Sequence, residues 1–205
     1  MAGWSVEATG LGHRFTDRWV FVGQHFQIPA GARVALTGMN GSGKSTLGRV
    51  IAGHLVPSDG SCCWNAVHTS GSEVLLHTLL VGTGSALPPH LTAREALKWH
   101  ATFRSVPEPA AVTRTWEDAG IGGFLDAPLR TLSTGMRARI HLGLAWGTAA
   151  PLVVLDEPAA NLDAAGKVWY RSLLDRWAER ATVVVCTNAP EEECPQADLR
   201  LHLGE

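Results

Sequence analysis

Long apolar runs and an excess of charge are both missing from this sequence. No apolar stretch approaches the ~18 residues that a membrane-crossing helix needs, so we expect no membrane span. Lysine and arginine number 17 against 19 acidic residues, which gives a net charge of −2. A balance this even argues against a polybasic nucleic-acid binder, and we expect no nucleic-acid partner.

Cysteine is scarce as well, and its placement excludes two further classes. The four cysteines are Cys62, Cys63, Cys186 and Cys194. None of them form a C-x-x-C pair, and Cys62 and Cys63 are direct neighbours. The nine histidines show no H-E-x-x-H spacing. The start, MAGWSVEATG, lacks the basic region and apolar stretch of a secretory signal. We therefore expect reduced thiols in the cytosol rather than a disulfide framework or a zinc site.

The chain does contain enough apolar residues to build a core. Its 205 residues, 45% of them hydrophobic, fit one α/β domain or a core with a small attached lobe. Short strands are predicted over Trp4–Ala8, Trp19–Phe26, Arg33–Thr37, Ser61–Asn65 and Glu73–Val81. Fully apolar runs predict buried strands over Leu152–Leu155 and Thr182–Cys186. Strands alternating with helices in the last third imply a parallel sheet.

Helical patterns fall between these strands. They cover Ser45–Ala52, Thr92 to about Thr102, Glu108–Ala119, a stretch through Met136, Ile140, Gly143 and Leu144, and Val168–Trp177. Thr92 and Glu95 have the spacing of a capping box. The middle helices indicate a helical lobe inserted into a strand-rich core.

A glycine-rich loop follows the strand ARVALTG. Its sequence GMNGSGKST matches G-x-x-x-x-G-K-[ST] and lies between a predicted strand and a predicted helix. Glycines let backbone N–H groups curl around a phosphate, and the helix that follows points its positive end there. Lys44 is placed to reach the β- and γ-phosphates and Ser45 to hold Mg²⁺. The candidate nucleotide-binding residues are Gly38, Asn40, Gly41, Ser42, Gly43, Lys44, Ser45 and Thr46.

Two carboxylates end the apolar strand in PLVVLDEP. We expect this strand to lie beside the strand that precedes the glycine-rich loop. Asp156 would then hold Mg²⁺, directly or through water. Glu157 would lie near the γ-phosphate, where it could polarise an attacking water. Lys44, Glu157 and Mg²⁺ held by Ser45 and Asp156 thus form a candidate catalytic set for ATP.

A second phosphate-binding pattern occurs at LSTGMRAR, where Ser, Thr and Gly precede a helix with two arginines. Taken in order, GMNGSGKST, LSTGMRAR and LVVLDEP resemble the ATP-binding cassette (ABC) ATPase family over nearly the whole chain. The resemblance implies an α/β fold, a P-loop NTPase of ABC type. It implies a mixed sheet core, an N-terminal antiparallel β part and an inserted helical subdomain over about residues 84–150. The rest of this single domain, 1–205, would be a RecA-like core plus a β subdomain.

The resemblance also explains why one short chain carries two such stretches. In that family two cassettes pair head to tail, and each signature stretch caps the ATP held by the partner's phosphate loop. By this reading Ser133 and Gly135 contact a γ-phosphate across the interface of a dimer, which we expect to be a homodimer. PAANLD is similar to the family's D-loop, so Asp163 would couple the two sites.

Phe15 lies at the spacing before Lys44 at which the family carries an aromatic that stacks on adenine. Stacking of this kind is worth roughly 1–3 kcal/mol by analogy with bases on aromatic platforms. Plain core packing is the alternative for Phe15.

Two positions depart from the family pattern. TVVVCTNAPEEE places Asn188 where the family has a histidine that donates to the γ-phosphate. An Asn amide still donates a hydrogen bond but carries no charge, and losing such a donor outright costs ~2.7–4 kcal/mol. We therefore expect slow hydrolysis. The alternative for Asn188 is a simple turn residue before Pro190. Thr83 falls at or near the place of the family's glutamine, which puts the usual link to the helical lobe in doubt.

The favoured function is the ATP-binding and ATP-hydrolysing subunit of an ABC transporter, peripheral on the cytoplasmic face of the cell membrane. An integral membrane subunit would supply the path, and TAREAL resembles the start of the lobe that touches it. RWVFVGQHF, and CCWN after PSDG, are similar to haem-exporter ATP-binding subunits of cytochrome c maturation. One alternative is a nucleotide-gated regulatory module with little or no hydrolysis. Another is a soluble ABC protein acting on nucleic acid or ribosomes, which the even charge disfavours.

Overall fold

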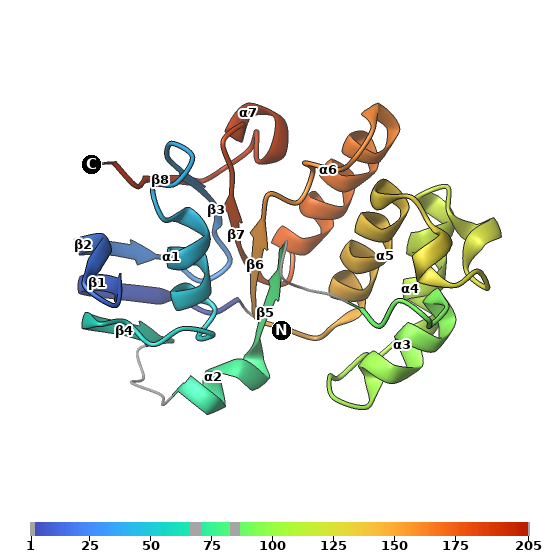
Figure 1. Cartoon of the computed structure of the whole chain (residues 1–205), viewed down its shortest axis with the longest axis horizontal. Helices are drawn as coiled ribbons and strands as arrows, with labels where there is room; N and C mark the ends of the chain where they lie inside the picture. The colour runs from blue at the N-terminus through green and yellow to red at the C-terminus, as the bar shows by residue number, and fades with distance from the viewer. Residues whose placement is uncertain (1–2, 66–70, 83–86, 205) are drawn as a thin grey trace. The chain divides into compact units, whose positions relative to one another are not determined.

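The chain folds as two compact units. A computed structural model describes residues 3–65, 71–82 and 87–204. The sheet unit consists of Met1–Leu80, Ala150–Glu157 and Asp175–Glu205, and the helical unit of Val81–Ala149 and Pro158–Leu174. Their elements are labelled in Figure 1.

The first part of the sheet unit is an antiparallel sheet in the order β2-β1-β4. Its strands are β1 (Val6–Phe15), β2 (Arg18–Ile28) and β4 (Asp59–Trp64). β1 is much longer than the predicted Trp4–Ala8, because it continues through irregularities in its pairing with β2 between Ala8 and Arg14. Gly10, with φ 59°, supplies the conformation that such a bulge needs.

The second part is a five-stranded sheet in the order β5-β6-β7-β3-β8. Its strands are β3 (Arg33–Thr37), β5 (Thr78–Val81), β6 (Leu152–Asp156), β7 (Thr182–Cys186) and β8 (Leu199–His202). β7 pairs in parallel with both β3 and β6, and β8 pairs in parallel with β3. The predicted parallel sheet is confirmed. The expectation that β6 lies beside β3 is wrong, because β7 lies between them.

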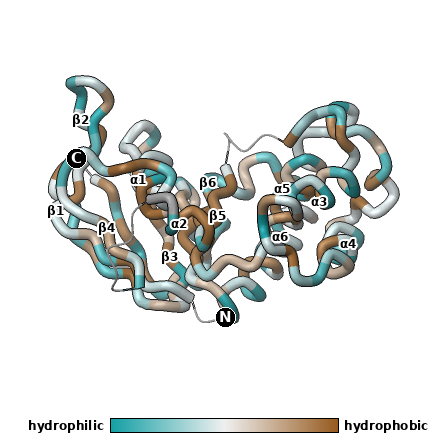
Figure 2. Tube along the Cα trace, turned by 90° about the horizontal axis from the view of Figure 1, so that it is seen from below, coloured by the Kyte–Doolittle hydropathy of each residue, from teal (hydrophilic) through white to brown (hydrophobic). Residues whose placement is uncertain are grey.

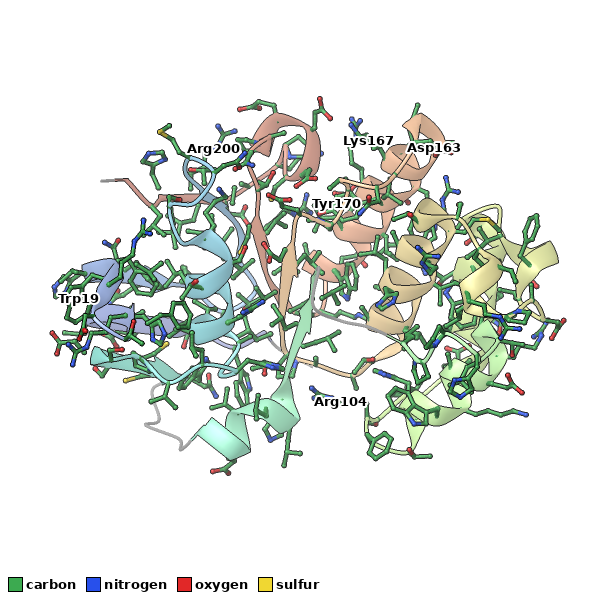
Figure 3. All side chains as sticks on the ribbon, viewed as in Figure 1. Trp19, Arg104, Asp163, Lys167, Tyr170 and Arg200 are labelled. Carbon is green, nitrogen blue, oxygen red and sulfur yellow. The ribbon has the colours of Figure 1, made fainter. Side chains whose placement is uncertain are left out.

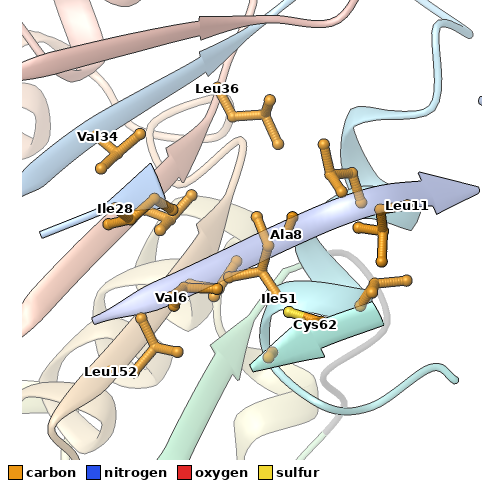
Figure 4. Packing of buried hydrophobic residues seen from close by; sticks show 14 of the residues in the cluster. Val6, Ala8, Leu11, Ile28, Val34, Leu36, Ile51, Cys62 and Leu152 are labelled. Atoms are coloured by element: carbon orange, nitrogen blue, oxygen red, sulfur yellow. The ribbon is translucent and has the colours of Figure 1, made fainter. Parts of the chain in front are cut away.

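The core of the sheet unit joins both sheets. Figure 4 shows Val6, Leu11 and Ile28 of the antiparallel sheet packed with Val34, Leu36 and Leu152 of the parallel one. Helix α1 (Lys44–Ile51) packs on β6 and β7, and α7 (Pro190–Glu193) precedes β8. The apolar strands β5 and β6 are brown in the hydropathy-coloured trace of Figure 2. Strands buried on both faces need such continuous apolar runs.

The helical unit has a core of its own. Its helices are α3 (Ala93–Ala101), α4 (Pro109–Asp118) and α5 (Thr134–Gly147), with 3₁₀ turns η1 (Gly122–Phe124) and η2 (Leu129–Thr131). Trp116 is fully buried and donates to the Ile140 carbonyl at 3.2 Å. A side chain at Gly143 would collide with that indole ring. The capping box of Thr92 and Glu95 is confirmed, and the bonds to Thr92 lower the pKa of Glu95.

One predicted strand is wrong over most of its length. Glu73–Val81 is not a single strand: α2 covers Gly71–His77 and β5 begins at Thr78. A short apolar run such as VLLHTLLV has no periodicity that separates the two structures.

Helix α6 (Ala164–Ala178) buries Tyr170, Leu173, Leu174 and Trp177, the face predicted for it. In the part of the chain that the structure describes, no helix combines the length and apolar character that crossing a membrane requires.

Candidate functional site

The glycine-rich loop connects β3 to α1 in the sheet unit. Gly41 and Gly43 have φ of 82° and 100°, in the left-handed region that favours glycine. Gly43 is the N-cap of α1 and has no side-chain cap, so the first N–H groups of the helix point into the loop without a side-chain acceptor. The Lys44 ammonium donates to the carbonyls of Gly38 and Met39 at 2.8 and 2.9 Å. The loop therefore closes around a cation and the positive end of a helix.

Close packing leaves no room for side chains at two of the glycines. A Cβ on Gly38 would lie 2.5 Å from the Leu203 carbonyl oxygen, and one on Gly43 would lie 2.5 Å from Val20. The Ser42 hydroxyl is buried and has no hydrogen-bond partner among the described residues. The fold thus fixes the path of the loop and leaves one polar atom in it unsatisfied.

Ser45 and Asp156 come together from α1 and the end of β6. The Ser45 hydroxyl donates to Asp156 at 3.0 Å. Hydroxyl and carboxylate oxygens are the ligands that Mg²⁺ prefers. In the described residues there is no group of three His, Cys, Asp or Glu residues placed to hold a metal without help, so a cation here needs further oxygen ligands.

Glu157 follows directly and is held in an unusual conformation. Its φ is 49°, rare for a residue with a side chain, and its N–H donates to the Cys186 carbonyl at 2.9 Å. Such conformations cost of order 1–3 kcal/mol and cluster at functional sites. The strain sets the direction of the carboxylate at the end of β6.

Asn188 links Glu157 to the loop. Its side-chain amide donates to the Asn40 side-chain oxygen, and also to Glu157 at 3.4 Å. Residues far apart in the sequence thus meet at the carboxyl ends of β3, β6 and β7. The sequence predicts either a phosphate donor or a simple turn residue at Asn188. Because its amide binds both Asn40 and Glu157, its side chain does more than shape a turn.

A buried thiol lies beneath this cluster. Cys186 is fully buried and its Sγ donates to the Lys44 carbonyl at 3.7 Å. Burial, reinforced by Asp156, raises the pKa of the Cys186 thiol far above its usual range. It therefore serves as a neutral packing group, and a Cβ on Gly48 of α1 would lie only 2.8 Å from its sulfur.

Phe15 lies at the end of β1. The residue is 50% exposed, so plain core packing is wrong for it. The ring meets the His13 ring edge-on, with centroids 4.8 Å apart, and His13 is buried. Trp19 on β2 is a second exposed aromatic of the same hairpin (Figure 3), and Arg14 lies over its ring.

The remaining predicted residues belong to the helical unit. Ser133 is the N-cap of α5, and its hydroxyl accepts from the Met136 N–H at 3.2 Å. Asp163 directly precedes α6 (Figure 3) and accepts from the Gly166 N–H at 2.7 Å. Gly135 lies in the first turn of α5. Thr83 lies outside the described residues.

The sequence predicts no role for Arg139, although the structure connects it to Asp163. Its guanidinium donates to Asp163 at 2.5 Å. Arg139 is one of the two arginines of LSTGMRAR, but nothing in the sequence pairs it with a residue 24 positions later.

Comparison with known proteins is consistent with this geometry. The family model described as "ABC transporter" matches residues 22–160. The chain is 30% identical over 203 residues to the cytochrome c biogenesis ATP-binding export protein CcmA of Pseudomonas putida, covering 98% of this chain and 97% of that protein. It is 32% identical over 188 residues to the protein of that name from Salmonella typhi, covering 90% of each.

Solved structures show the same fold. A putative ABC transporter ATP-binding protein from Pyrococcus furiosus superposes with a TM-score of 0.83 at 24% identity, over 97% of both chains. A bacterial Atm1-family ABC exporter with ATP bound superposes with a TM-score of 0.81 at 21% identity, over 97% of this chain and 37% of that one. The predicted fold class is confirmed, and the comparisons give no support to the regulatory alternative. This chain belongs to the ABC transporter family, as an ATP-binding subunit.

Proposed function

We propose that this chain hydrolyses ATP with Mg²⁺ as one half of a cassette dimer, and that it drives transport through a separate integral membrane subunit. The observation that carries the proposal is the cluster at the ends of β3, β6 and β7. There Lys44, Ser45 and Asp156 supply a cation and hard oxygen ligands, while Glu157 and Asn188 lie hydrogen-bonded beside them.

The loop fits a triphosphate. Lys44 is bound to carbonyls of its own loop, contacts that phosphate oxygens would replace with stronger ones, since charge-assisted bonds are roughly twice as strong as neutral ones. The uncapped start of α1 and the orphaned Ser42 hydroxyl add donors that favour an anion. We assign the nucleotide phosphates to Gly38, Asn40, Gly41, Ser42, Gly43, Lys44, Ser45 and Thr46, and the adenine to Phe15.

Mg²⁺ would be held by Ser45 and Asp156, and it would offset charge on the β- and γ-phosphates. Glu157 orients the attacking water and accepts its proton, and its strained backbone keeps the carboxylate directed for that task. Asn188 holds Glu157 through its amide. A neutral amide stabilises developing charge less than an imidazolium does, so we propose slow turnover.

The second half of each site comes from a partner cassette, which we propose is a second copy of this chain. Ser133 and Gly135 at the start of α5 would cap the γ-phosphate on the partner, because uncompensated N–H groups at a helix start bind anions. Asp163 would transmit the state of one site to the other. The helical subdomain over about residues 84–150 would carry the contact with the membrane subunit.

The named relatives suggest a cellular role. We propose that the chain serves an export system of cytochrome c biogenesis and acts peripherally on the cytoplasmic face of the cell membrane. Expression in a Pseudomonas putida strain lacking its own CcmA tests this role. Recovery of covalent haem in its c-type cytochromes, dependent on Lys44, would support the proposal, and no recovery with the matching membrane subunits co-expressed would contradict it.

Phosphate release by the purified protein tests the chemistry. Wild-type protein with Mg·ATP should release phosphate slowly, and Lys44→Ala should abolish the release. Release by the Lys44→Ala protein at the wild-type rate would show that another activity accounts for it.

A further inference from the structure

One face of α5 packs against the loop that precedes α6, within the helical unit. Gly135 and Arg139 are four residues apart on α5 and therefore lie on the same side of the helix. Gly135 meets the backbone of this loop: a Cβ there would lie 2.8 Å from the Asn161 carbonyl oxygen. The loop itself is anchored by Ala159 and Leu162, both buried, with the Leu162 N–H donating to Ala159.

An ion pair one turn further along α5 completes this contact. The Arg139 guanidinium donates to Asp163 at 2.5 Å, and the same carboxylate oxygen accepts from Gly166 at 2.7 Å. The Arg139 side chain is 13% exposed, whereas that of Asp163 is 69% exposed. A largely buried guanidinium thus pairs with an exposed carboxylate, and the start of α6 also holds that carboxylate through the Gly166 N–H.

Gly166 provides the space for this guanidinium. A Cβ at position 166 would lie 2.8 Å from the Arg139 guanidinium and 3.1 Å from the Asp163 carboxylate. The Nε of Arg139 is buried and has no hydrogen-bond partner in the part of the chain that the structure describes. Ion pairing with Asp163 therefore holds an arginine that has at least one unsatisfied buried donor, a poor arrangement for stability alone.

We propose that Arg139 is a positioning residue, which fixes the Asp163 carboxylate relative to the Ser133–Gly135 start of α5. This inference rests on the proposed function, in which both groups act on the partner's nucleotide. Gly135 and Arg139 bind the loop from the same helix face, so the α5 start and Asp163 move as one body. The partner's nucleotide then meets both groups at once.

Gly166→Ala separates this role from plain stabilisation. Alanine favours a helix more than glycine does, and the atom it displaces is the flexible end of Arg139. The gain in helix propensity offsets part of the cost of loosening the ion pair, so the variant should stay folded while Arg139 is moved away from Asp163. A merely structural ion pair predicts a stable and fully active Gly166→Ala protein.

The experiment measures ATP-dependent phosphate release, its dependence on ATP concentration, and melting temperature for five variants. These are Arg139→Ala, Arg139→Lys, Asp163→Asn, the Arg139→Ala/Asp163→Asn double variant, and Gly166→Ala. Arg114→Ala is the matched control, because Arg114 makes an exposed ion pair with Glu108 at 2.5 Å in the same unit.

We expect Arg139→Ala, Asp163→Asn and Gly166→Ala each to lower kcat by about tenfold and to reduce cooperativity in ATP. Arg139→Lys should recover part of the loss. The double variant should be no slower than the slower single variant, because residues that act as one unit are not additive. Arg114→Ala should match wild type.

Two results would overturn the inference. One is that Gly166→Ala and Arg139→Lys both keep the kcat and the cooperativity of Arg114→Ala. The other is that the fold-loss in kcat of the double variant equals the product of the losses of the two single variants. Failure of the proposed function looks different, since the wild type would then release no Lys44-dependent phosphate. In that case the same variants are made in the Glu157→Gln background, and gel filtration measures their ATP-induced dimerisation. Weaker dimerisation by Gly166→Ala would uphold the inference, and unchanged dimerisation would overturn it.

Discussion

The two stretches of this chain that we propose bind phosphate are built in contrasting ways. The sheet unit brings together most of the groups that we propose act on ATP. Its loop, Asp156, Glu157 and Asn188 meet through hydrogen bonds at the ends of adjoining strands. The helical unit offers only an exposed helix start and an exposed carboxylate, Ser133 and Asp163.

This difference indicates which half of the site is sufficient for binding. The backbone of Glu157 is strained and Lys44 is buried, so both are held in place without a ligand, and we expect the sheet unit to bind ATP by itself. Ser133 uses its hydroxyl to cap its own helix, where it accepts from the Met136 N–H. In the proposed dimer, Ser133 would act only on a phosphate that a second molecule brings to it.

Glu157→Gln would break the chemistry of the sheet unit and should have the largest effect. Losing a general base costs about 10²–10⁴-fold in rate. Phosphate release should fall by that factor while equilibrium binding of ATP, followed by a fluorescent analogue, stays near wild type. An active Glu157→Gln protein would remove Glu157 from the mechanism.

Ser133→Asp sharpens the contrast from the other side. Aspartate is as good an N-cap as serine, so α5 should keep its start, but the added charge repels a γ-phosphate. Hydrolysis should fall by about 10²–10³-fold, the cost of losing one preorganised donor, while the protein alone still binds ATP. Ser133→Asn, which caps equally well without charge, is the control; equal losses in both variants would point to the cap rather than to repulsion.

Phe15→Ala tests whether the exposed aromatic at the end of β1 belongs to the nucleotide site. Loss of stacking should weaken ATP binding by roughly 1–3 kcal/mol, measurable by calorimetry, with no loss of melting temperature since the ring is half exposed. Trp19→Ala changes the neighbouring exposed aromatic and should leave binding intact. The reverse ranking would move the adenine to Trp19.

Asn188→His should have the smallest effect and the opposite sign. An imidazole restores a donor that can also carry charge, so kcat should rise by roughly tenfold or less. Asn188→Ala, which removes both amide contacts, should lower it. If histidine and alanine slow the enzyme alike, the Asn40–Asn188–Glu157 arrangement is itself what this chain requires.

The sequence predicted the parts of the site that depend on short contiguous strings. GMNGSGKST contains a loop and the start of α1, and PLVVLDEP contains strand β6 and its two carboxylates, so local sequence determines the structure of each. The contact between Asn188 and Asn40 was not predictable, because it depends on β7 lying beside β3, whereas β6 was expected there.

The errors in the fold have the same origin. Glu73–Val81 was predicted as one strand, since a short apolar run does not distinguish helix from strand without its tertiary partners. The role we infer for Arg139 needed the space left by Gly166 and the backbone at Asn161, neither of which has a signature in the sequence.

Complementation between two inactive variants tests the composite site most directly. Lys44→Ala removes the loop's cation and Ser133→Asp blocks the cap, so a pair containing one of each keeps a single intact site. Mixing equal amounts should restore phosphate release to at most about a quarter of the wild-type rate, because half of randomly paired dimers are mixed and each has one intact site of two; coupling between the sites would lower this value. Release no greater than the sum of the two separate variants would contradict an ATP site shared between Lys44 of one molecule and Ser133 of another.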